Sequence, residues 1–361
     1  MKKISIAAMC ALTLAFLSCG KDNPGNNNTD TGVTEQNVLT DFANVVVNPD
    51  YQDIQAKAAI LNTSIQTLNT STTDANLAAA QKAWKDTRAA WESCEGFLFG
   101  PVEDNSYDPT MDDWPVNKVD LDALISSNNP LQLADIDPLE TTLKGFHAIE
   151  YVIFGVGGTR KASEITAREK LYVVSLAQSL YNTTTQLRNS WDPASGNYTA
   201  QVVNAGNGST RYTTRKAVFI ALVGSMADIC NEVANEKMQT PLTAKDSTLD
   251  ESSFSHNSVT DFKNNITGVL NAYKCQYGGV SGAHSLSQLV ASKNAALDSK
   301  IQSQINAAIA SFSGITTTYE KAIYSQPSQI KAVQNAINAL KATLDPDGGE
   351  LSVFINTYIK D

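Results

Sequence analysis

Apolar residues recur at intervals of three and four along almost the whole chain, and this spacing restricts the fold more than any other feature. The pattern is clear in two stretches, one early and one late: Ile54, Ala58, Leu61, Ile65 and Leu68, and then Ile330, Val333, Ile337, Leu340 and Leu344. Such spacing gathers apolar side chains on one face of an α-helix. The alternation that is typical of strands is almost absent. The sequence therefore predicts an all-α fold.

The predicted helices fall into two groups separated by a loop. Besides the two stretches above and a third at 297–312, we expect helices at about 73–96, 139–154, 164–190, 211–238 and 258–275. Loop signals cluster at 101–118, 192–210 and 239–257. The middle loop divides the body into residues 36–195 and 196–361, each with room for about four long helices. Four amphipathic helices can close one core, so we predict two four-helix-bundle domains.

The N-terminus has the pattern of a bacterial lipoprotein signal. Two lysines precede an apolar stretch at residues 4–17, and Phe16-Leu17-Ser18-Cys19 resembles a lipobox, in which the cysteine is lipidated. We therefore expect residues 1–19 to be a signal peptide and the polar residues 20–35 to be a flexible tether. The predicted location is the cell envelope, lipid-anchored on the periplasmic or cell-surface side of the outer membrane. A plain secretory signal that leaves Cys19 free is the alternative.

Composition excludes several classes of protein. The 361 residues are 42% hydrophobic and 18% charged, which suits a packed core, and the net charge of −10 argues against nucleic-acid binding. No apolar run reaches the roughly 18 residues of a spanning helix, so we expect no integral membrane protein. Three cysteines without CxxC spacing remain after the lipobox, and we expect buried thiols: Cys94, Cys230 and Cys275.

Charged residues share an apolar stripe in the helix predicted at 73–96. Trp84, Arg88, Trp91 and Glu95 are spaced by four, three and four, so they lie within about 60° of one another around the helix. Tryptophan favours burial, whereas a buried charge is costly unless it is paired. Arg88 and Glu95 must therefore be ion-paired, solvated in a cleft, or in contact with a ligand.

A second polar pair lies in the helix predicted at 139–154. His147 and Glu150 are one turn apart on the same face, and Gly145 precedes them. An imidazole and a carboxylate at this spacing can chelate one metal ion. A structural hydrogen bond between the two side chains is the alternative interpretation.

The segment Gly145-Phe146-His147-Ala148-Ile149-Glu150 resembles the GxHxxE signature of the imelysin-like proteins, a bacterial envelope family named for an insulin-cleaving membrane protease. Other segments resemble the same family in its usual order: Trp84 to Pro101, Asp113-Trp114-Pro115, Phe254 to Ser258, Asp261 and Asn265. The resemblance implies two similar four-helix bundles with a site where they meet. It also implies a lipoprotein or periplasmic role that is associated with iron uptake.

Three functions remain open at this stage. We expect the protein to bind iron or another divalent metal, or an iron-containing ligand, through His147, Glu150 and Glu95, with Arg88 facing an anionic group. Haem is the weaker form of this hypothesis, and iron-transport components would be the partners. A metallopeptidase that uses the HxxE motif is the first alternative, although no complete zinc-peptidase motif is present. A glycan- or protein-docking lipoprotein is the second.

The second half of the chain contributes candidate residues at the start of the helix predicted at 258–275. Ser258 and Asp261 have the spacing of a capping box, which is one interpretation. The other places Ser255, Ser258 and Asp261 against the His147 region, across the boundary between the two bundles. His256 and His284 lie in loop-like contexts, where a surface histidine is the expectation.

Overall fold

The computed structural model describes residues 33–360, and Val33–Asp361 forms one compact unit. The predicted signal peptide, Cys19 and nearly all of the predicted tether lie outside the described residues. Within the described part, regular structure is helical apart from one short antiparallel pair, β1 (Gln276–Tyr277) and β2 (Val280–Ser281). The all-α prediction is therefore confirmed.

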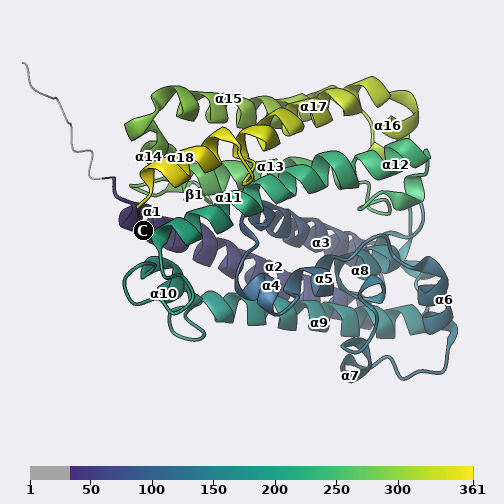
Figure 1. Cartoon of the computed structure of the whole chain (residues 1–361). Coiled ribbons are helices and arrows are strands. Elements are labelled where there is room, and N and C mark those ends of the chain that lie inside the picture. The colour runs from purple at the N-terminus through teal and green to yellow at the C-terminus, as the bar shows by residue number, and fades with distance from the viewer. Residues whose placement is uncertain (1–32, 361) are drawn as a thin grey trace, which may run out of the picture. The chain divides into compact units, whose positions relative to one another are not determined.

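Four helices of the first half pack into one bundle, seen as the lower layer in Figure 1: α2 (Asn48–Thr70), α3 (Asp74–Cys94), α8 (Gly145–Phe154) and α9 (Ala167–Trp191). Both α3 and α9 begin at a threonine N-cap, Thr73 and Thr166, whose hydroxyl accepts a backbone N–H of the first turn. Aromatic rings fill one end of this bundle, where Tyr51 and Phe99 pack on Trp191.

Four helices of the second half form the upper layer of Figure 1: α11 (Arg215–Glu232), α13 (Ser258–Lys274), α15 (Ala295–Ser311) and α17 (Pro327–Leu344). The apolar stripe that begins at Ile330 is buried in this bundle, as the periodicity predicts. Shorter helices complete the layer: α12 (Gln239–Ala244), α14 (Leu286–Lys293), α16 (Tyr319–Ser325) and α18 (Glu350–Tyr358). The domain boundary between residues 195 and 196 stays a prediction.

The two bundles meet where α3 and the turn after it pack against α13 and α11. At the crossing of α3 and α13 the backbones touch. A Cβ on Gly268 would lie 2.4 Å from the carbonyl oxygen of Ser93, and one on Gly96 would lie 2.8 Å from the carbonyl carbon of Gly268. Because only glycine permits this approach, these two positions bring polar side chains of α3 next to those of α13.

The predicted loops contain short helices, which is the main correction to the secondary-structure prediction. Segment 101–118 holds α4 (Pro101–Asp104) and α5 (Tyr107–Asp112), segment 192–210 holds α10 (Tyr198–Val203), and segment 239–257 holds α12. These helices are too short for a periodic apolar stripe to identify them. The remaining short helices are α1 (Glu35–Asp41), α6 (Lys118–Ser126) and α7 (Leu133–Ile136).

The helical run Arg215–Ala244 comprises α11, a π-helical turn (Val233–Lys237) and α12. It is long and apolar enough to cross a membrane, and 61% of its most apolar window is buried inside the protein. It packs against α13, α17 and α18. These contacts identify it as a core helix of the second bundle.

Candidate metal centre

Gly145 sets the position of the motif helix. Its φ is +74°, and a Cβ there would lie 2.1 Å from the carbonyl oxygen of Met111. The backbone of α5 therefore lies directly against the first turn of α8, which places Asp112 beside His147. The glycine of the motif therefore makes room for this neighbouring backbone.

His147 is buried between two carboxylates. Its Nδ1 lies 2.9 Å from Oε2 of Glu150, and its Nε2 lies 3.0 Å from Oδ1 of Asp112, although the second contact is not well aligned for a hydrogen bond. The other oxygen of Glu150 accepts the backbone N–H of Ser255 at 2.7 Å. Glu150 thus lies behind the imidazole and fixes its orientation, while Nε2 faces the interior of the site.

Arg88 is the central cation of the site and is completely buried. Its guanidinium contacts carboxylates from four segments: Asp112, Glu92, Glu251 at 2.8 Å, and Asp261 at 3.9 Å. The indole N–H of Trp91 donates to Asp112 at 2.6 Å. Arg88 is therefore an internal counter-charge, and it is not free to hold an anionic ligand as the sequence analysis expected.

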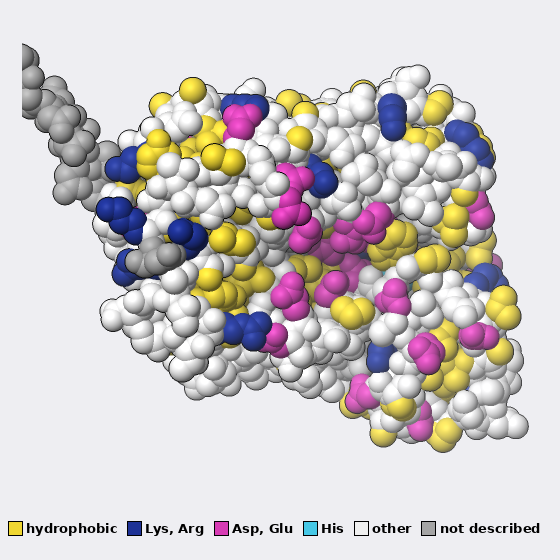
Figure 2. Space-filling model, viewed as in Figure 1, with side chains coloured by type: hydrophobic (Ala, Val, Ile, Leu, Met, Phe, Trp, Pro, Cys, Tyr) yellow, Lys and Arg dark blue, Asp and Glu magenta, His cyan; other side chains and the backbone are white. Residues whose placement is uncertain are grey.

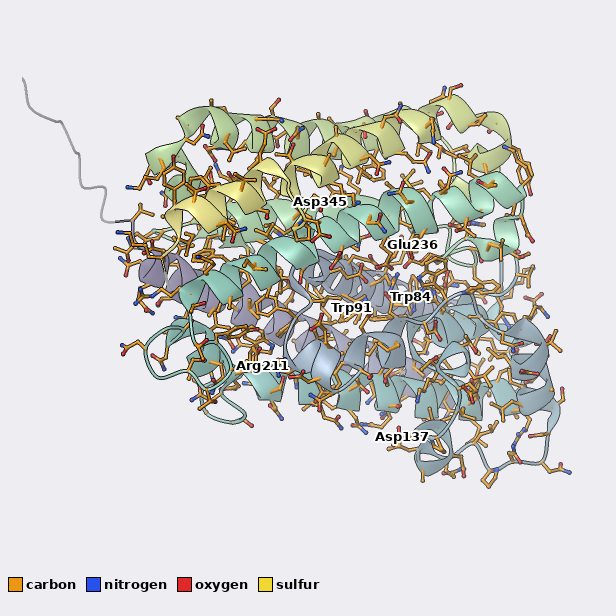
Figure 3. All side chains as sticks on the ribbon, in the orientation of Figure 1. Trp84, Trp91, Asp137, Arg211, Glu236 and Asp345 are labelled. Carbon is orange, nitrogen blue, oxygen red and sulfur yellow. The ribbon has the colours of Figure 1, made fainter. Side chains whose placement is uncertain are left out.

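The two tryptophans of the predicted stripe, Trp84 and Trp91, are labelled in Figure 3, on the layer that contains α3. Trp84 donates its indole N–H to the carbonyl of Phe146 at 3.0 Å, and Arg88 lies over the ring of Phe146, 5.3 Å from its centroid. The stripe thus fixes α8 against α3, and the charged residues on it face the second bundle.

Glu95 pairs with the second bundle instead of with Arg88. Its Oε2 lies 3.2 Å from Nζ of Lys237 and also accepts the side-chain N–H of Asn265. Lys237 is buried in the π-helical turn after α11, and its ammonium also contacts Glu251 at 2.8 Å. Asn265 on α13 donates to Glu92 as well. Lys237 therefore joins the two sides of the interface.

Burial and the neighbouring charges shift several pKa values. Burial raises the pKa of Glu92 and Glu95 well above the usual range, although Arg88 opposes the shift at Glu92 and Lys237 opposes it at Glu95. Burial raises the pKa of Asp261 to about 7 in spite of Arg88. At Asp112 the effect of burial is outweighed by Arg88 and His147, which lower the pKa.

The pKa values of His147, Lys237 and Arg88 are raised, whereas burial alone lowers the pKa of a basic side chain. Burial alone would lower the pKa of His147, but its contacts with Asp112 and Glu150 raise it to about 9. Burial would also lower the pKa of Lys237, whereas the surrounding carboxylates raise it. The protonated forms of these side chains are favoured because the carboxylates of the site outnumber its bases.

Three overlapping groups of side chains could hold a metal ion, since their ligand atoms lie within 4.8 Å of one another: Asp112, His147 and Glu251; Glu92, Glu251 and Asp261; and Glu92, Glu95 and Asp112. All six residues are buried. Among the described residues, neither Glu150 nor His256 belongs to such a group. The potential ligand atoms come from α3 and the turn directly after it, from α5, α8 and α13, and from the loop before α13.

Two cavities reach this centre from different sides. The first has a volume of about 340 Å³ and reaches Glu95, with acidic side chains around it: Glu103, Asp108, Asp228 and Glu232. Figure 2 shows acidic side chains gathered around a hollow where the two layers meet. The second cavity has a volume of about 370 Å³ and reaches Glu251. A cation arriving at the first cavity meets a negative potential that favours its entry.

Two of the three candidate residues of the second half, Ser255 and Asp261, contact residues of the first bundle, whereas Ser258 contacts Asp250 and Ser252. Ser255 contacts Glu150, and Asp261 faces Arg88. The capping box is wrong, because the N-cap of α13 is Asn257 and Ser258 is the first helical residue. The hydroxyl of Ser258 donates to Asp250 and accepts the N–H of Ser252, so it is unavailable for capping.

The remaining histidines and cysteines agree with the sequence analysis. His256 and His284 are partly exposed, and each pairs with a carboxylate outside the groups of potential metal ligands, Glu320 and Asp41 respectively. Cys94, Cys230 and Cys275 are buried free thiols.

Several residues of the centre escaped the sequence analysis. Glu92 lies one turn after Arg88 on the same face of α3, and this spacing could have identified it. Asp112 precedes the Asp-Trp-Pro segment, but a short helix gave no periodic signal. Lys237 lies in the π-helical turn after α11, and Glu251 lies in the loop before α13. In neither segment does the sequence offer a pattern that separates a buried charge from a solvated one.

Comparisons with known proteins identify a family and solved structures with the same fold. The family model described as imelysin matches residues 47–346. The chain is 29% identical to iron-regulated protein A of Synechococcus elongatus over 350 residues, 96% of this chain and 92% of that protein. Two crystal structures share the fold. A protein of Parabacteroides distasonis, assigned as an iron-regulated protein A precursor, has a TM-score of 0.80 and 24% identity, covering 94% of this chain and 98% of that one. An imelysin-like protein of Psychrobacter arcticum has a TM-score of 0.68 and 14% identity, covering 85% and 92% respectively.

Proposed function

The chain belongs to the imelysin family, and we propose that it binds iron in the charged centre between its two bundles, as a step in iron uptake at the cell envelope.

The observation that carries the proposal is an excess of buried carboxylates over buried cations. Six acidic side chains lie in or against the centre, all of them buried: Glu92, Glu95, Asp112, Glu150, Glu251 and Asp261. They face two basic side chains, Arg88 and Lys237, and one histidine. Buried charge without compensation is costly. A divalent cation would balance these carboxylates in place of the protons that the raised pKa values of Glu92, Glu95 and Asp261 favour.

Asp112, His147 and Glu251 are the residues that fit a metal best. Nε2 of His147 and Oε2 of Glu251 are buried atoms without a hydrogen-bond partner. Glu150 accepts from the opposite nitrogen of the imidazole, which is the arrangement that commonly orients a metal-binding histidine. A bound metal ion would be coordinated by one imidazole nitrogen and by carboxylate oxygens.

Iron is the favoured metal for two reasons. Carboxylate oxygens with a single imidazole form a hard donor set that suits iron or manganese better than copper, and no thiolate is among the potential ligands. In addition, the relative from Synechococcus elongatus is named iron-regulated protein A. This name connects the relative with iron, and we extend the connection to this chain as part of the proposal.

The test is anaerobic calorimetric titration of the purified protein with Fe²⁺, with Mn²⁺ and Zn²⁺ in parallel. We expect one tight site for Fe²⁺ at micromolar concentration or below, and a loss of affinity of about 100-fold in His147→Ala and in Asp112→Asn. His284→Ala is the matched control, because it also removes a histidine that pairs with an aspartate. It should leave the titration unchanged.

Melting curves recorded without metal separate function from structure. If the centre exists to bind metal, His147→Ala retains its helical content, and above about pH 9, where the imidazole no longer contributes to stability, it melts close to the parent. Absence of binding by the parent protein at micromolar concentration, or equal binding by His147→Ala and His284→Ala, would contradict the proposal.

A further inference from the structure

The second cavity has apolar walls and a charged base. Its volume is about 370 Å³, and its walls include Val116, Val156 and Phe254. Val116 and Val156 come from the loops that follow α5 and α8 in the first bundle, and Phe254 comes from the loop before α13 in the second. The cavity therefore lies between the two bundles. A hydrated ion makes no favourable contact with such apolar walls, whereas the hydrocarbon part of an organic molecule is stabilised by packing against them.

Two carboxylates at this cavity have unused acceptor atoms. Asp250 is 1% exposed and Glu251 is 2% exposed, yet both line the cavity. Oδ2 of Asp250 accepts the hydroxyl of Ser258, while Oδ1 has no hydrogen-bond partner, and Oε2 of Glu251 has none either. A buried acceptor without a donor is costly, so these two atoms point to a missing donor in the cavity.

The charges around Asp250 are unbalanced. Three carboxylates line the cavity: Asp250 itself, Glu251 and Glu320. Two bases line the cavity, but each already has an acidic partner. Lys118 pairs with Asp122, and His256 pairs with Glu320 at 2.8 Å. Oε2 of Glu320 also has no hydrogen-bond partner. The missing donor should therefore carry a positive charge.

A metal ion does not fit this position as well as an ammonium group does. Among the described residues, Asp250 belongs to none of the groups whose ligand atoms converge on one point. A primary ammonium has three N–H donors and can be joined to an apolar chain, which matches both the carboxylates and the walls.

We propose that this cavity binds a primary organic amine, with its ammonium group on Asp250 and Glu320 and its hydrocarbon part against Val116, Val156 and Phe254. This inference goes beyond the proposed metal binding and does not require metal. Because Glu251 is shared with the proposed metal centre, the tests rely on Asp250 and Glu320 instead.

The experiment is calorimetric titration of the full protein in excess EDTA with three probes of equal chain length: n-hexylamine, n-hexanol and hexanoate. We expect saturable binding of hexylamine at one site, at least tenfold tighter than that of hexanol, and no binding of hexanoate. Asp250→Asn and Glu320→Gln should each weaken hexylamine binding tenfold or more. Asp345→Asn, which removes a carboxylate that does not line this cavity, is the charge-matched control and should bind like the parent.

The variants are first compared with the parent by circular dichroism and thermal melting. If Asp250→Asn does not fold, Glu320→Gln is the decisive variant, because Glu320 is less deeply buried than Asp250. Equal affinity for hexanol and hexylamine would overturn the proposal, as would parent-like hexylamine binding in Glu320→Gln. Since the titrations contain no free metal, their failure would leave the iron proposal untouched, and the reverse also holds.

Discussion

Gly268 on α13 lies against the carbonyl oxygen of Ser93 on α3, so closely that a Cβ at Gly268 would be 2.4 Å from that oxygen. This contact fixes the distance between the two bundles. Because Glu92, Glu95, Asp261 and Asn265 lie on the same two helices or directly after them, the crossing also sets the geometry of the charged centre. The stability and the site of this protein therefore depend on the same interface.

The first prediction concerns this crossing. Gly268→Ala should lower the free energy of unfolding by about 2 kcal/mol or more, because the added methyl group forces the helices apart. Gly224→Ala on α11 is the matched control, since a Cβ there has no atom within 4 Å. It should be neutral or stabilise by up to about 1 kcal/mol. Urea denaturation of both variants measures the difference, and equal effects would show that the crossing is not tight.

The second prediction concerns pH. The pKa of His147 is about 9 in the folded protein and 6.5 in its ordinary state, so its stabilising contribution is complete below pH 6.5 and is lost as the pH rises to about 9. The raised pKa of Asp261, about 7, acts in the same direction between about pH 4 and 7. The metal-free protein should therefore become less stable from pH 5 to pH 9.

His147 is expected to contribute at most about 3 kcal/mol of this loss. Thermal melts in EDTA at several pH values should show a falling melting temperature for the parent. His147→Asn should be flatter between pH 6.5 and 9. A parent whose stability rises over that range would contradict the assigned charge of the imidazole.

Much of this fold could be predicted from the sequence, because long helices with an apolar stripe carry their own signal. The helices that begin near Asp74, Ala167, Ser258 and Pro327 all match predicted segments to within a few residues. Helices of four to six residues, such as α5, were missed because an apolar stripe can be recognised only over at least two helical turns.

The centre was only half predictable for a related reason. Arg88 and Glu95 were identified because a charge on an apolar stripe is an anomaly that spacing reveals. Asp112, Lys237 and Glu251 lie in a short helix, a π-helical turn and a loop, and their burial results from tertiary packing. Sequence spacing also placed Glu150 beside His147 correctly, but only the structure shows that it lies behind the imidazole.

The third prediction concerns Lys237, whose ammonium occupies a position between Glu95 and Glu251. Lys237→Met should destabilise the metal-free protein by about 3 kcal/mol or more, because it leaves buried carboxylates unpaired. The same change should tighten Fe²⁺ binding at least tenfold, since it removes a competing cation. Lys263→Met, at an exposed position on α13, should alter stability by no more than about 0.5 kcal/mol. Weaker iron binding by Lys237→Met would show that the lysine supports the site.

The fourth prediction concerns Cys19, which lies outside the described residues. We propose that it is lipidated and anchors the protein in the cell envelope. Cys19→Ala should move the protein from the detergent phase to the aqueous phase in Triton X-114 partitioning. Cys10→Ala, which alters a cysteine inside the predicted signal peptide, should leave it in the detergent phase. Retention of Cys19→Ala in the detergent phase would contradict lipidation.

The most direct test of the central claim is a crystal soaked anaerobically in Fe²⁺, with diffraction data recorded on both sides of the iron absorption edge. We predict one anomalous difference peak within about 2 to 2.5 Å of Nε2 of His147 and of carboxylate oxygens of Asp112 and Glu251. A peak only at surface carboxylates, or no peak at all in crystals that diffract well, would contradict iron binding at this centre.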